Sequence, residues 1–390
     1  MISDISIKNF KSVVDVSLPL GRFNLLIGAN GCGKSNILEG IAMGAAASSD
    51  KLDYEYFANR GIRVVEPHLM TSAFDGIDDK VITLSIDSGE KYSPSFNISY
   101  NRGVKPARWE TDSQNINSVL TEIKKLIPNG HPKSGDVLKM IAQIEESKGK
   151  IQYSIRLKRT KDDHTELMSV NPEISQFLIY SLEESKLRQA DNSNRTYPLG
   201  RHGEGLFAYL KELSQRPDSN TIFEEIKEHL KILDWFDDLE VPTGQLSMEF
   251  NIKLKDSYLT DTLNTFDQRS TNEGFLYLLF YLTLIISDET PRFFAIENID
   301  TAFNPKLCRE VTRRLIELAR KHNKQIIATT HNPAVLDGIN LYEDDVRLLV
   351  VRRTIDGYTK TNRVTLKGEM TMPLSEAWQK GFIGGLPDNF

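Results

Sequence analysis

The sequence predicts an α/β fold with a mixed central sheet and an antiparallel β layer. Four short apolar stretches have the length of buried strands, and helical patterns lie between them, as is typical of α/β folds. They are residues 23–27, 293–296, 325–328 and 348–351. Four further stretches also read as short strands, of which the last two alternate between apolar and polar residues, like strands of an antiparallel layer. These are residues 5–10, 13–18, 81–86 and 96–100.

A phosphate-binding loop is the strongest single motif. Residues 28–35, GANGCGKS, fit the pattern G-x-x-x-x-G-K-[ST]. A predicted buried strand precedes the loop and a predicted helix begins at residue 36, which is the context in which such loops occur. Glycines allow backbone N–H groups to turn towards a phosphate, and the helix N-terminus adds a partial positive charge. We therefore expect ATP binding, with Lys34 on the β- and γ-phosphates and Ser35 on Mg²⁺.

Length and composition limit the class of protein. The chain has 390 residues and a net charge of −6, so it is long enough for two domains or one domain with insertions, and it has no global basic field. Cys32 and Cys308 form no disulfide framework, and no secretory signal precedes the first strand. Both observations predict a cytoplasmic protein. The longest apolar run, residues 275–286, is shorter than the roughly 20 residues of a membrane span, so we expect a buried helix and no membrane partner.

The chain divides into three predicted parts, residues 1–101, 102–200 and 201–390. The middle part is expected to be an inserted helical region, because apolar residues recur at helical spacing in 116–126 and 137–144. The third part is expected to complete the fold. It contains predicted helices at 205–213 and 221–233, the second beginning with a capping-box pattern at Thr221, and a half-exposed strand at 245–255. Residues 172–197 show no clear pattern.

Two polar side chains follow apolar strands. Glu297 comes directly after residues 293–296, and His331 follows the strand at 325–328. Phosphate-loop NTPases need an acid beside the loop to hold Mg²⁺, and an imidazole at a strand end can contact the γ-phosphate and the attacking water. The alternatives are an acid that faces solvent and a structural histidine. With the loop present, we favour the functional interpretation of both.

These motifs, with the opening Ile5-x-x-Lys8-Asn9-Phe10-Lys11-Ser12, resemble an ABC-type ATPase head of the RecF/SMC/OLD kind. In that group the loop has the form G-x-N-G-x-G-K-S-N, which residues 28–36 match. The resemblance implies a P-loop NTPase fold of the ABC-ATPase type with an inserted helical subdomain. It also implies a set of nucleotide-binding residues, namely Gly28, Asn30, Gly31, Gly33, Lys34, Ser35 and Asn36. Residues 297–300 resemble the Walker B and D-loop segment, residues 328–331 the H-loop strand, and 384–390 the stand-alone ATPases of bacterial antiphage gene clusters.

Such heads dimerise head-to-tail around two ATP molecules, each loop facing the partner's signature segment. Here the signature-like segment is residues 270–274, STNEG. Gly274 fits the pattern and would face the partner's γ-phosphate, whereas Asn272 takes the place of the family's serine. An ordinary helix cap is the alternative interpretation of this segment.

Two departures from the family pattern concern catalysis. The family usually has Asp-Glu where this chain has Glu297-Asn298. If Glu297 holds Mg²⁺ with Ser35, Asn298 and His331 can position water, but Asn298 cannot accept a proton and turnover should be slow. If Glu297 is itself the base, the metal loses a ligand. In addition, no Gln occurs between Asn36 and Gln114, so the usual Q-loop ligand is missing or replaced.

The expected function is a slow ATPase that forms a homodimer or higher homo-oligomer on ATP and signals to a separately encoded effector, possibly a nuclease, in antiphage defence. The stretch after His331 is too short for the Toprim nuclease domain of OLD-type proteins. The alternatives are a non-hydrolysing scaffold and a RecF-like DNA repair factor. Nucleic acid is possible but not required, because the basic groups near 102–108, 156–161 and 186–201 are interspersed with acids. Trp378, Phe382 and Phe390 form either a tail folded on its own core or a docking strap.

Overall fold

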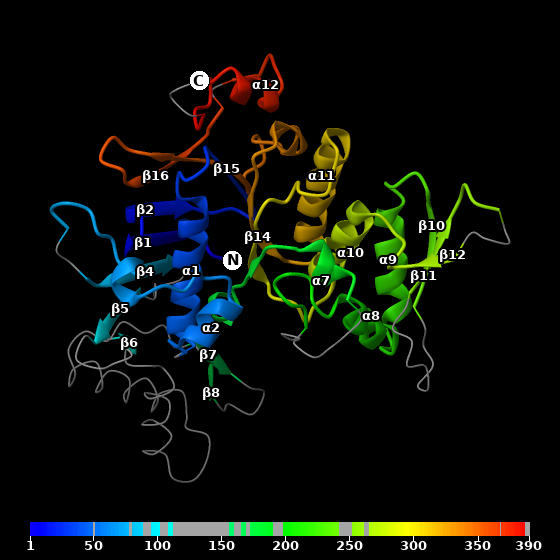
Figure 1. Cartoon of the computed structure of the whole chain (residues 1–390), viewed down its shortest axis with the longest axis horizontal. Helices are drawn as coiled ribbons and strands as arrows, with labels where there is room; N and C mark the ends of the chain where they lie inside the picture. The colour runs from blue at the N-terminus through cyan, green and yellow to red at the C-terminus, as the bar shows by residue number, and fades with distance from the viewer. Residues whose placement is uncertain are drawn as a thin grey trace, which may run out of the picture.

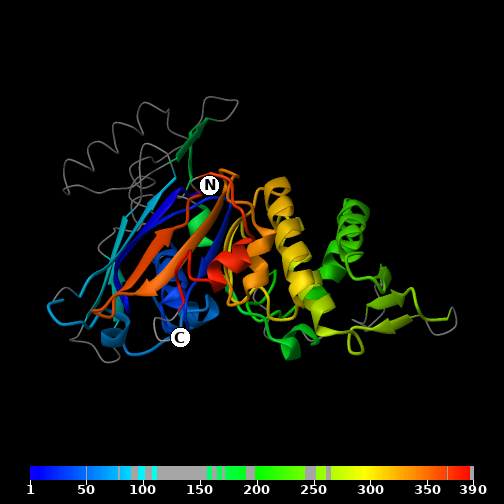
Figure 2. The same cartoon turned by 90° about the horizontal axis from the view of Figure 1, so that it is seen from above.

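The computed structural model describes most of both lobes. It covers residues 1–49, 51–77, 80–88, 95–101, 108–111, 156–159, 165–168, 172–189, 198–241, 252–260, 265–366 and 368–386. Helix α1 (Lys34–Ser48) lies between an antiparallel sheet and the central sheet, and four further helices cover the other face of the central sheet (Figures 1 and 2). The predicted α/β fold with an additional antiparallel layer is confirmed.

The antiparallel sheet is built around the N-terminal hairpin. Its strand order is β2 (Val13–Pro19), β1 (Asp4–Phe10), β4 (Ile82–Asp87), β5 (Ser95–Asn101) and β6 (Arg108–Thr111). Ile5 and Ile7 are fully buried on the face towards α1. The helix approaches so closely that a Cβ on Gly44 would lie 1.7 Å from the Leu84 side chain. The small-residue stretch of α1 therefore allows tight packing of helix on sheet.

The central sheet is mixed. Its order is β16 (Thr359–Arg363), β15 (Val346–Arg353), β3 (Phe23–Ile27), β14 (Gln325–Thr329), β13 (Phe293–Ile296) and β9 (Ile179–Tyr180). Only β16 is antiparallel to its neighbour, and the other pairs are parallel. Every residue of β3, β13 and β14 is buried, which explains their apolar sequences. Their carboxyl ends meet at one edge, where α/β sheets bind ligands.

Helices cover the other face of this sheet. They are α8 (Leu206–Ser214), α9 (Ser219–Leu230), α10 (Glu273–Ile286) and α11 (Pro305–Lys321). Residues 275–286 of α10 are all buried, so the predicted core helix is confirmed. The predicted start of α9 at Thr221 is wrong. The helix begins at Ser219, and the carboxylate of its N-cap residue, Asp218, accepts from the Arg216 guanidinium instead of capping the helix.

A small antiparallel sheet lies at the end of the molecule beyond α9 (Figures 1 and 2). It comprises β10 (Phe236–Glu240), β11 (Lys253–Asp256) and β12 (Thr265–Asp267). Strand β11 coincides with the last residues of the strand predicted at 245–255. Residues 245–251 of that stretch and the helical hairpin predicted at 116–126 and 137–144 lie outside the described residues.

Several short elements complete the described chain. They are α2 (Tyr54–Asn59), α3 (Pro67–Met70), β7 (Arg156–Arg159), β8 (Thr165–Met168), α6 (Pro172–Ser175), α7 (Glu184–Leu187), the 3-10 helix η1 (Pro333–Gly338) and α12 (Leu374–Gln379). Among the described helices, none is both long and apolar enough to cross a membrane. In the C-terminal tail Trp378 is buried in the core, Phe382 is 69% exposed, and Phe390 lies outside the described residues. The predicted division of the chain at residues 102 and 200 stays a prediction. Two strands from the predicted middle part belong to the main sheets, β6 to the antiparallel sheet and β9 to the central sheet.

Candidate nucleotide-binding site

The predicted phosphate loop connects β3 to α1, as the sequence indicates. Gly28, Gly31 and Gly33 have φ angles of 151°, 75° and 112°, which glycine adopts most readily. A Cβ on Gly28 would lie 2.1 Å from the carbonyl oxygen of Val351, and one on Gly33 would lie 2.1 Å from the hydroxyl of Thr359. A Cβ on Gly31 would meet nothing within 4 Å. Two glycines are therefore needed because β15 and β16 pack against the loop, and the third borders open space.

The side chain of Lys34 lies across the loop. Its ammonium group donates to the carbonyl oxygens of Gly28 and Ala29, at 2.8 and 3.2 Å, and only 7% of the residue is exposed. Burial lowers the pKa of Lys34 below its usual value, while the neighbouring Cys32 and Glu297 oppose that shift. Because both acceptors are neutral carbonyl groups, the positive charge remains available to an anionic phosphate.

Ser35 and Glu297 meet at the edge of the sheet. The Ser35 hydroxyl donates to Oε1 of Glu297 at 2.6 Å, although 262 positions separate the two residues in the chain. Hydroxyl and carboxylate oxygens are ligands that Mg²⁺ prefers, usually together with phosphate and water. In the described part of the chain no three His, Cys, Asp or Glu residues form a metal site by themselves. These two residues therefore fit a magnesium ion that also binds nucleotide phosphates.

Asn298 has a left-handed backbone, with a φ of 50°. Its N–H donates to the Thr329 hydroxyl at 3.0 Å, and its carbonyl accepts from the Thr301 hydroxyl at 2.8 Å. Asn adopts this conformation more readily than most residues. The residue after the strand-end acid is thus held by the end of β14, beside the site.

His331 is exposed and follows β14 on the same edge. Its pKa is lowered by partial burial and by the positive charge of Lys34, while Asp300 opposes the shift. A lowered pKa keeps the imidazole neutral at pH 7, so that it can accept a hydrogen bond as well as donate one. The structure therefore brings His331 to the edge that carries Lys34 and Glu297.

The N-terminal hairpin and α1 form a polar network beside the loop that the sequence did not reveal. Asn36 donates to the Ser12 hydroxyl at 2.7 Å and accepts from Arg63 at 2.9 Å. Glu39, only 2% exposed, accepts from both Lys11 and Arg63. Lys11 and Ser12 belong to the motif at the start of the sequence, whereas Arg63 lies in a loop that carries no recognisable pattern. Asn30 is exposed on the loop.

The edge strand β9 was also not predicted from the sequence. The N–H of Glu297 donates to the carbonyl of Tyr180 at 2.8 Å, and the N–H of Ser181 donates to the carbonyl of Arg201 at 2.9 Å. Burial lowers the pKa of Arg201, and Glu297 is the strongest of the acids that oppose this shift. A strand of two residues is too short to give a periodic signal.

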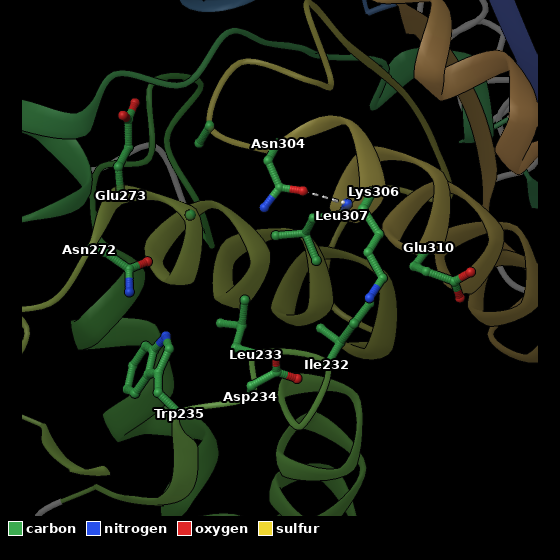
Figure 3. A pocket seen from close by; sticks show the side chains of 12 residues that line it. Ile232, Leu233, Asp234, Trp235, Asn272, Glu273, Asn304, Lys306, Leu307 and Glu310 are labelled. Atoms are coloured by element: carbon green, nitrogen blue, oxygen red, sulfur yellow. Dashed lines mark hydrogen bonds between the residues drawn. The ribbon is translucent and has the colours of Figure 1, made fainter. Parts of the chain in front are cut away.

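The signature-like segment lies at the N-terminus of α10. Asn272 caps the helix, because its Oδ1 accepts from the N–H of Phe275 at 2.8 Å. A Cβ on Gly274 would lie 3.1 Å from the carbonyl oxygen of Ala302, so the segment packs against the region after Asp300. A pocket of about 530 Å³ opens here. It is lined by Asn272 and Asn304, at the ends of two helices, and by Trp235 (Figure 3). Asn272 therefore caps α10, as either interpretation of the segment allows.

Comparison with solved structures identifies the fold. The structure entitled "Crystal structure of the SmcHead bound to the C-winged helix domain of ScpA" matches with a TM-score of 0.51 at 14% identity, covering 94% of this chain and 98% of that one. A Pyrococcus furiosus structure of the Smc head with an extended coiled coil, bound to the C-terminal domain of ScpA, gives 0.49 at 14% identity over 97% and 98%. The SMC head domain from Thermotoga maritima gives 0.44 at 13% identity over 94% and 99%. The fold is that of an ABC-type ATPase head.

A family comparison is consistent with this class. Residues 23–337 match the family described as "AAA domain, putative AbiEii toxin, Type IV TA system". Since the match spans most of the chain, the protein belongs to this AAA domain family and is a nucleotide-binding ATPase head. No match to a curated protein was found.

Proposed function

We propose that the protein binds ATP with Mg²⁺, hydrolyses it slowly, and uses the bound nucleotide to hold two heads together. The observation that carries the proposal is the 2.6 Å bond between Ser35 and Glu297, because it joins the two predicted metal ligands beside the phosphate loop. The backbone of residues 28–34 would hold the phosphates, and Lys34 would leave its loop carbonyls for the β- and γ-phosphates.

The predicted slow rate follows from the residues around Glu297. A bound Mg²⁺ would neutralise phosphate charge. Asn298 and neutral His331 would orient the attacking water, but the amide of Asn298 cannot take its proton. The left-handed backbone of Asn298, fixed by Thr329, holds this weak catalytic group in place. Nucleotide would therefore stay bound for long periods, as a switch requires.

In the proposed dimer each signature-like segment faces the partner's nucleotide, with Gly274 near its γ-phosphate. Gly274 lies in the first turn of α10, where the helix dipole favours an anion, and this position supports the role. The nucleotide state would be passed to a separately encoded effector, such as a nuclease, in antiphage defence within the cytoplasm. The family's description as a putative toxin of a Type IV TA system agrees with a role in a multi-gene system.

Nucleotide binding tests the site directly. Lys34→Ala should abolish binding of a fluorescent ATP analogue, and Glu297→Gln should remove the part of the affinity that depends on Mg²⁺. Glu376→Gln, which changes an exposed acid paired with Lys380 on α12, is the matched control and should bind normally. Retained Mg²⁺ dependence in Glu297→Gln would contradict the assignment of the metal site.

Phosphate release distinguishes the proposed ATPase from its alternatives. If the wild-type protein releases phosphate no faster than Lys34→Ala, the result favours a non-hydrolysing scaffold. Salt-sensitive DNA binding that is lost when Lys158, Arg159 and Lys161 are neutralised would instead favour a RecF-like repair factor.

A further inference from the structure

Arg188, directly after α7, is bound to the loop that precedes α10. Its Nη1 donates to the carbonyl oxygens of Gln268 and Arg269 at 2.9 and 3.2 Å, and its Nη2 donates to that of Thr271 at 2.9 Å. From the other side, Oε1 of Glu184 accepts from Nε and Nη2 at 2.9 and 2.6 Å. The planar, multidentate guanidinium therefore fixes the backbone at the start of the signature-like segment.

A second bond joins the same two parts of the molecule. The hydroxyl of Tyr277, on α10, donates to the carbonyl oxygen of Leu182 at 3.0 Å. Burial raises the pKa of Tyr277 to about 12, so the hydroxyl keeps its proton at neutral pH. The N-terminal part of α10 and the loop before it are thus held at two points by residues 182–188.

The same stretch reaches the nucleotide site at its other end. Strand β9 pairs in parallel with β13, and the N–H of Glu297 donates to the carbonyl of Tyr180 at 2.8 Å. Residues 180–188, which we call the coupling segment, therefore connect the backbone of Glu297 to the guanidinium of Arg188.

We propose that Arg188 is a positioning residue that sets the signature-like segment for the nucleotide of a second head. This inference rests on the proposed ATP-dependent dimer. The contacts of Arg188 are with residues 268–271 and Glu184, so its loss should leave nucleotide binding by its own phosphate loop intact. Without the guanidinium, three backbone carbonyls lose a charged donor, and Asn272 and Gly274 lose their fixed position.

Arg216 provides a matched control. Its side chain is 25% exposed, as is that of Arg188, and it binds three acids, Asp218, Asp288 and Glu289. These contacts join the turn between α8 and α9 to the turn after α10, away from the coupling segment. Arg216→Ala therefore removes an equally exposed guanidinium together with its ion pairs and should leave turnover unchanged.

The test mixes two defective heads. Lys34→Ala keeps an intact signature-like segment but has no working phosphate loop, whereas Arg188→Ala has the reverse. Alone, Arg188→Ala should hydrolyse ATP at least about tenfold more slowly than the wild type, yet bind a fluorescent ATP analogue normally. Mixed, the two variants should regain turnover, because one site of the mixed dimer combines an intact loop with an intact signature-like segment. Arg188→Lys, which keeps a donor, should show an intermediate rate.

A parallel mixture separates this inference from the dimer itself. Gly274→Asp places a negative charge where the partner's γ-phosphate would lie, and mixing it with Lys34→Ala should also restore turnover. If that mixture recovers and the Arg188→Ala mixture does not, the positioning role is overturned while the dimer stands. If neither recovers, the dimer fails and this inference with it. Loss of analogue binding by Arg188→Ala, or an equal loss of turnover in Arg216→Ala, would also overturn the inference.

Discussion

Asn298 has two properties that bear on catalysis and on stability. It lacks a basic group, and its φ of 50° disfavours most other side chains. A carboxylate at this position should therefore help chemistry and harm the backbone at the same time. Asp tolerates the left-handed region better than Glu does, since Asp and Asn are enriched there.

We predict that Asn298→Glu raises the rate of phosphate release and lowers the free energy of unfolding by about 1 kcal/mol. Asn298→Asp should cost less stability but place its carboxylate closer to the backbone, so a smaller gain in rate is expected. Asn298→Gln is the control that keeps the length of Glu without a base. An unchanged or lower rate in Asn298→Glu, with ATP binding retained, would contradict the assignment of Glu297 to the metal and of position 298 to the catalytic base.

The two thiols should be unreactive in the folded protein. A thiol reagent would block nucleotide binding only if Cys32 were exposed, but Cys32 and Cys308 are only 3% and 1% exposed. Burial also raises the pKa of Cys308 to about 11, which suppresses the reactive thiolate. A colorimetric thiol assay should therefore detect almost nothing under native conditions and both thiols in denaturant. Rapid native labelling of Cys32 would show that the loop opens.

Among the elements, strands β3, β13 and β14 and the helices α10 and α11 were predictable because their signals are local. Continuous apolar runs identify strands buried on both faces, and α11 begins with a capping asparagine, Asn304, followed by Pro305 at the first helical position. Strand β9 was not predictable, because two residues carry no period. The start of α9 was predicted two residues too late, because Ser219 and Asn220, which precede the capping-box pattern, already belong to the helix.

The cap of α10 gives a prediction at this level. Asn272→Ala should lower the free energy of unfolding by about 1 kcal/mol, because the N–H of Phe275 loses its acceptor. Asn272→Ser, which restores the residue of the family signature, keeps a capping oxygen and should be nearly neutral. Urea unfolding of the two variants measures the difference. Equal losses in both would show that the amide of Asn272 has a structural role other than capping.

Across the whole molecule, Lys324 connects the sheet to the turn after α10, at the edge opposite the nucleotide site. It is only 1% exposed, and its ammonium group donates to the hydroxyl and carbonyl of Thr290 at 2.7 and 3.0 Å. Burial lowers the pKa of Lys324 to about 7, well below the value of about 10.4 in an unfolded chain.

This shift predicts how stability depends on pH. Between pH 7 and 9 the unfolded chain binds a proton at Lys324 that the folded chain releases, so the free energy of unfolding should rise with pH, by about 2 kcal/mol from this group. Lys324→Met should remove that part of the slope, which chemical denaturation at several pH values can measure. Parallel profiles for the variant and the wild type would mean that Lys324 stays charged in the fold.

The sequence by itself determined the phosphate loop, the strand-end acid and histidine, the buried helix and the class of fold, since each depends on neighbouring residues. Only the tertiary structure decided that Ser35 meets Glu297 and that Arg188 holds the loop before Gly274. These contacts join residues 262 and about 80 positions apart, and they depend on which strands are neighbours and in which register. No local pattern carries that information, because strand order is set by the packing of the whole core.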